Sequence, residues 1–155
     1  MVIPRKEVPM PTPFESAFLK LQLFDLRREA TLREARSWFL LEFNPETFEE
    51  FVALLSGDRN ASIRMVLGYW DMAASLVTTG AIDRDAFLAA HTEIIGTFCK
   101  IQPFLAELRE VSGEPGFCKH LESVVLAAPN AESMLARRRE GLRAAARARE
   151  AEKRP

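Results

Sequence analysis

The chain has 155 residues and a formal net charge of −1, with 48% hydrophobic and 28% charged residues. This balance excludes wholesale disorder, and the length fits one domain, because chains divide only beyond about 250–300 residues. Seven Gly, one Tyr and few β-branched runs exclude an all-β sandwich or barrel. The near-neutral charge gives the whole molecule no strong attraction to nucleic acid or membranes.

The first residues and the cysteines bear on location. Residues 1–13 contain four prolines and no apolar signal-peptide region, so we expect an extended, proline-rich arm. No run of about 18 apolar residues occurs, so no transmembrane segment is expected. Cys99 and Cys118 have neither the number nor the spacing of a disulfide scaffold or zinc site, which predicts buried thiols. These features predict a cytoplasmic protein.

Residues 14–43 are predicted to be helical. They contain no Gly and no Pro and are rich in strong helix formers. We expect one long helix, or two with a break near Arg28–Thr31. Apolar residues four and three positions apart make a stripe on this segment, comprising Phe14, Phe18 and Leu21. A short helix follows from Asn44, its expected cap, to Gly57.

Residues 60–79 form the most apolar predicted helix. One apolar stripe includes Ile63 and Trp70, and a second includes Met65 and Met72. Together the stripes cover most of the circumference. We therefore expect a central helix surrounded by others, or one with a face in a dimer interface.

Three further helices complete the prediction. Residues 84–111 carry apolar residues at steps of four and three, and Pro103 should kink that helix. A shorter helix begins near Phe117 and stops before Pro129. Asn130 caps a last segment with few bulky apolar residues, which should fray or project.

We therefore predict an all-α, single-domain helical bundle of five or six helices. The extended arm covers residues 1–13, the bundle covers 14–128, and a basic Ala/Arg-rich C-terminal helix or tail covers 129–155.

A candidate ligand or interface region lies on two of these helices. Asp71 is a carboxylate in the most apolar helix and therefore needs a polar partner. His91 lies on an apolar stripe. The alternatives are a structural ion pair or hydrogen bond for Asp71 and a hydrogen-bonded core position for His91, or a small-molecule site. The candidate residues are Tyr69, Trp70, Asp71, Met72 and His91.

Charge is distributed unevenly along the chain. Residues 137–155 hold seven Arg and one Lys against three Glu, a net charge of +5, which leaves −6 on the rest. Three interpretations of the tail are open: a solvated helix end, docking on an acidic surface, or binding to nucleic acid. Residues 130–155 contain no aromatic residue for base stacking, which disfavours the last of these. The candidate contacts are Arg137, Arg138, Arg139, Arg143, Arg147 and Arg149.

Several segments follow the order found in a known family. They are Trp70 to Asp83, Gln102 to Arg109, Pro115-Gly116-Phe117 and His120-Leu121-Glu122. This order resembles a widespread, uncharacterised all-helical bacterial family, classed among domains of unknown function, over about residues 20–128. The resemblance implies a helical fold and supplies no catalytic residue. Many family members look membrane-anchored by an N-terminal helix, and the proline-rich arm departs from that pattern.

The sequence favours a non-enzymatic interaction or scaffold module. It contains no GxGxxG, GxxxxGK[ST], GxSxG, CxxC or HExxH motif, so we expect no cofactor, metal site or nucleophilic chemistry. The apolar surface of 60–79 favours a homodimer or another protein partner. The alternatives are nucleic-acid association through the tail, and a small-ligand-binding protein or enzyme that uses the 69–91 region.

Overall fold

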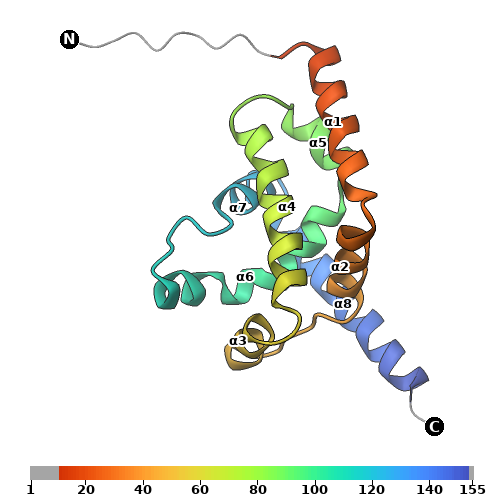
Figure 1. The fold of residues 1–155 in the computed structure, drawn as a ribbon, viewed down its shortest axis with the longest axis vertical. Coiled ribbons are helices and arrows are strands. Elements are labelled where there is room, and N and C mark those ends of the chain that lie inside the picture. The colour runs from red at the N-terminus through yellow and green to blue at the C-terminus, as the bar shows by residue number, and fades with distance from the viewer. Residues whose placement is uncertain (1–10, 154–155) are drawn as a thin grey trace.

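A computed structural model describes residues 11–153, which form eight α-helices and no strand (Figure 1). The helices are α1 Pro13–Arg27, α2 Ala30–Leu41, α3 Phe48–Ser56, α4 Asn60–Thr78, α5 Arg84–Ala90, α6 Glu93–Ser112, α7 Lys119–Leu126 and α8 Ala131–Glu152. The all-α prediction is confirmed, and the predicted count of five or six helices is wrong. Residues 1–10 of the predicted arm lie outside the described residues.

One of the additional helices comes from a break at His91. The sequence pattern predicted a continuous helix over 84–111, whereas α5 ends at Ala90 and α6 begins at Glu93. His91 adopts φ −130° and ψ 55°, and the chain restarts through shorter-range bonds from Ile94 N to His91 O and from Ile95 N to Thr92 O. No Gly or Pro marks this break. Pro103 lies inside α6, which continues through it to Ser112.

The other break falls where the sequence predicted it, near Arg28–Thr31. The Glu29 carboxylate accepts hydrogen bonds from Thr31 N at 3.0 Å and Leu32 N at 2.7 Å, and so caps α2. These backbone donors lower the pKa of Glu29. Thr47, rather than the expected Asn44, caps α3 by accepting from Glu50 N.

Helix α4 is the centre of the bundle and packs against α2, α3 and α7. Its stripe with Ile63 and Trp70 is buried as far as Ala74, as expected for a core helix, and Val77 at its end is partly buried. The second stripe is only partly covered, because Met65 and Met72 are about two-fifths exposed. Other elements therefore surround α4 over part of its circumference rather than nearly all of it.

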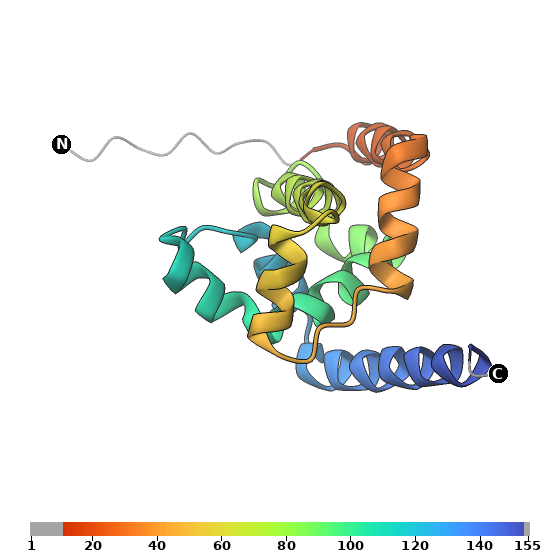
Figure 2. The same cartoon turned by 60° about the horizontal axis from the view of Figure 1, so that its bottom comes forward.

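Helix α8 lies along one side of the bundle and packs on α6 (Figure 2). Leu135 is its buried anchor, and Met134 and Leu142 are partly buried beside it. Farther along, Arg149 Nη1 donates to Leu41 O at 3.1 Å. The last turns extend past the other helices (Figure 1). The C-terminal segment is therefore a helix that is held to the bundle over its first half and touches it again near its end.

Candidate functional site

The predicted 69–91 region is a packed aromatic cluster in the core. Trp70 is fully buried, with the rings of Tyr69 and His91 edge-on at centroid distances of 5.0 and 6.1 Å. The Tyr69 hydroxyl donates to Leu23 O at 2.7 Å, and burial raises the pKa of Tyr69 to about 12. This phenol therefore stays protonated and serves as a hydrogen-bond donor that ties α1 to α4.

A group of charged side chains that the sequence analysis did not single out lies beside this cluster. Glu93 Oε2 accepts from Arg27 Nη2 at 3.0 Å, and Glu93 Oε1 accepts from Arg36 Nε at 2.7 Å. Arg36 Nη2 also donates to Oε2, so the two arginines share that oxygen. The Arg27 guanidinium lies over the Trp70 ring, 5.3 Å from its centroid. One carboxylate on α6 thus joins α1 and α2 to the core.

Asp71 serves as a cap for another helix. Its Oδ1 accepts from His120 N at 3.0 Å and from Leu121 N at 2.9 Å, in the first turn of α7. The α7 cap residue itself, Cys118, makes no side-chain capping bond. A carboxylate at a helix N-terminus is favoured by the free N–H groups and by the helix dipole. The structural alternative for Asp71 therefore has a clear physical basis.

His91 occupies a core position. It is 4% exposed, stacks on Phe87 with ring centroids 4.6 Å apart, and places Nδ1 3.0 Å from Phe87 O. Burial lowers the pKa of His91, which favours the neutral ring. Two cavities of the described residues, one beside Lys100 and one beside Arg138, are lined by residues other than Tyr69, Trp70, Asp71, Met72 and His91. A ligand or interface role for these five residues stays a prediction.

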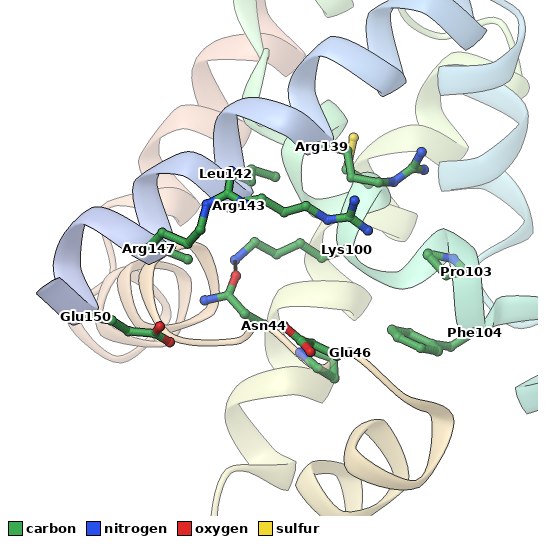
Figure 3. Close-up of a pocket in the computed structure, with 13 residues that line it drawn as sticks. Asn44, Glu46, Lys100, Pro103, Phe104, Arg139, Leu142, Arg143, Arg147 and Glu150 are labelled. Atoms are coloured by element: carbon green, nitrogen blue, oxygen red, sulfur yellow. Dashed lines mark hydrogen bonds between the residues drawn. The ribbon is translucent and has the colours of Figure 1, made fainter.

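The arginines of the C-terminal segment divide among three places. Arg139, Arg143 and Arg147 line a cavity of about 570 Å³ between α8, α6 and the loop that follows α2 (Figure 3). A second cavity, of about 350 Å³, is lined in part by Arg137 and Arg138. Arg149 is engaged with Leu41 O. The fold therefore gathers only part of the predicted polyanion set into one site.

Lys100 is the functional candidate that sequence reasoning missed. It is 9% exposed, and its ammonium donates to Phe39 O, Leu40 O and Phe43 O at 2.8–3.0 Å and to Asn44 Oδ1 at 2.9 Å. Burial, with a smaller contribution from Arg149, lowers the pKa of Lys100 to about 8. The sequence carries one signal for a buried lysine here: Lys100 lies among the apolar residues that recur at steps of four and three along this helix.

Helix α1 carries an apolar surface on its outer side. Phe14 is 79% exposed, Leu21 66%, Phe18 55% and Phe24 52%. These four side chains, which we call the α1 face, lie on one side of the helix because they are spaced four, three and three residues apart. The stripe that the sequence pattern indicated is present, but it faces solvent.

The arrangement defines an all-helical domain with a basic cavity and an exposed apolar helix face. The family model described as "Domain of unknown function (DUF4760)" matches residues 15–127, and the chain belongs to this family. The predicted resemblance over residues 20–128 is confirmed. No curated protein and no solved structure matches the chain.

Two findings concern metals and membranes. Among residues 11–153, no group of three or more His, Cys, Asp or Glu side chains is arranged to hold a metal ion. Within the same residues, each helix is too short or too polar to cross a bilayer.

Proposed function

We propose that this protein is a helical interaction module that forms a homodimer through the α1 face. The observation that carries the proposal is the exposure of Phe14, Phe18, Leu21 and Phe24 on one side of a single helix. Contiguous exposed apolar patches are uncommon on monomeric proteins and mark interaction sites. Phe is also among the residue types enriched at the centres of protein–protein interfaces.

The weak attachment of α1 to its own chain supports the proposal. Leu23 is the only buried residue of this 15-residue helix. Isolated helices shorter than about 12–15 residues are marginal in water, and α1, with 15 residues, is at this limit, so a helix with so little packing gains from a second surface. Each large apolar side chain contributes about 1.5–3 kcal/mol when it passes from full exposure to full burial.

Three polar contacts fix the direction in which α1 presents this face. Ser16 Oγ donates to Ala81 O at 3.3 Å, Leu23 O accepts from Tyr69, and Arg27 pairs with Glu93. All three lie away from the α1 face. A second copy is a suitable partner because a two-fold axis pairs one such face with itself and buries both stripes at once.

The test is the mass of the full chain in solution, measured by size exclusion with light scattering over a wide concentration range. We expect the wild type to reach twice the chain mass of 17.5 kDa. Phe18→Glu combined with Leu21→Glu should give the monomer mass with unchanged helicity, because both side chains are more than half exposed. Val111→Glu is the matched control, since Val111 is 72% exposed on α6. A monomeric wild type, or a double variant that still dimerises, would refute the proposal.

A further inference from the structure

The 570 Å³ cavity beside Lys100 has the size and lining of a small-molecule site. Pockets for such ligands measure about 300–1,000 Å³ and combine apolar walls with a few polar groups. Here Pro103, Phe104 and Leu142 supply apolar surface, and Lys100, Arg139, Arg143 and Arg147 supply positive charge (Figure 3). Asn44 and Glu46 lie on the loop opposite α8 (Figure 3).

The positive charges in this cavity exceed the negative ones. Four cationic side chains face two carboxylates, Glu46 and Glu150, which leaves a formal charge of +2 on the lining. Arg139, Arg143 and Arg147 are four residues apart on one face of α8, and like charges at this spacing repel one another. An anion held between them would relieve that repulsion.

The cations of the cavity carry positive charge that no ion pair among the described residues balances. Within the described part of the chain, no ion pair involves any of the four cations that line the cavity, which are Lys100, Arg139, Arg143 and Arg147. The four oxygens that accept from Lys100 are all neutral. Arg139 donates to Gln102 Oε1 at 2.7 Å, while its buried Nε has no acceptor among the described residues.

A phosphate monoester matches this lining better than a carboxylate does. It carries a charge of about −1.5 to −2 at neutral pH and offers three strong acceptor oxygens. Guanidinium groups bind such oxygens in a two-pronged geometry. A single carboxylate would leave about half of the excess charge unbalanced. The apolar wall at Phe104 and Leu142 suits an apolar body attached to the phosphate.

We propose that the cavity between α6, α8 and the loop following α2 binds a small organic phosphate. Arg139 and Arg143 hold the phosphate oxygens, Lys100 supplies a fixed positive charge below them, and Phe104 and Leu142 contact the body of the ligand. This role is separate from dimer formation, because none of these residues belongs to the α1 face.

Titration calorimetry on the full chain at fixed salt tests this site, with phenyl phosphate as the probe. We expect one saturable site per chain, with weaker binding of inorganic phosphate, which lacks the apolar body, and of benzoate, which carries one charge. Arg143→Gln should weaken phenyl phosphate binding roughly tenfold or more, the scale for losing a hydrogen bond between charged groups. Arg143 is exposed, so this change should leave the fold intact.

Arg137→Gln is the matched control. Arg137 lies on the same helix, is exposed, and does not line this cavity, so the loss of its charge should change affinity by less than about twofold. Absence of saturable binding, or equal losses from the two substitutions, would overturn the proposal. Tighter binding of a single-stranded oligonucleotide, weakened equally by both substitutions, would also overturn it and would assign the arginines to nucleic-acid contact instead.

Discussion

Glu93 gives the sharpest test of how the bundle is held together. Its carboxylate pairs with Arg27 on α1 and Arg36 on α2, and the three side chains are 13–19% exposed. Glu93→Gln keeps the size of the side chain but leaves two guanidinium groups in a poorly solvated place without a counter-ion. Removing one partner of a buried pair costs about 3–5 kcal/mol, and the residual exposure places this case near the lower end, at about 3 kcal/mol.

Urea denaturation and thermal melting followed by circular dichroism would measure this loss. For a chain of this size, about 3 kcal/mol corresponds to a fall in Tm of roughly 6–12 °C. Asp25→Asn is the control, since the Asp25–Arg28 pair is 3.7 Å apart with both side chains at least 70% exposed, and its loss should cost less than about 0.5 kcal/mol. If Glu93→Gln costs no more than the control, Glu93 does not hold α1 and α2 as argued.

Two further predictions concern Asp71 and His91. Asp71→Ala removes the acceptor of two α7 N–H groups and should lower the free energy of unfolding in urea by about 1–2 kcal/mol. Asp71→Asn keeps an acceptor and should lower it by less, so equal losses from the two variants would contradict capping. The pKa of His91 is lowered from 6.5 in the folded state, so the unfolded chain binds more protons than the folded chain just below that pH. The free energy of unfolding should therefore decrease as the solution is acidified through and below pH 6.5. This dependence should be weaker in His91→Gln, measured over the same pH series, and an unchanged slope would show that His91 does not titrate differently on folding.

The sequence predicted the parts of the fold that local patterns encode. The buried stripe of α4 with Ile63 and Trp70 follows from helical periodicity, because a stripe this continuous must be covered. The break before Thr31 follows from local chemistry, since Glu29 caps α2 from the adjacent residues. The break at His91 has no such signal. At the break the backbone turns at His91, whose buried ring packs against Trp70 and Phe87, and these are contacts between residues that a local pattern does not encode.

The candidate sites depend on contacts that sequence patterns do not record. Lys100 reaches oxygens that lie 56–61 residues earlier in the chain, and Asp71 caps a helix that lies 49–50 residues later. The α1 stripe shows a different limit. Phe14, Phe18 and Leu21 would have the same spacing whether they faced the core or solvent, so periodicity located the face without showing what covers it.

The contacts of Lys100 have a consequence for cooperativity. The carbonyls of Phe39 and Leu40 belong to the last turn of α2, where no intrahelical N–H is left to satisfy them, and an ammonium from the middle of α6 satisfies them instead. The end of α2 is therefore complete only when α6 is folded against it. Melting of either helix withdraws bonds from the other, and this mutual dependence favours unfolding of the two as one unit.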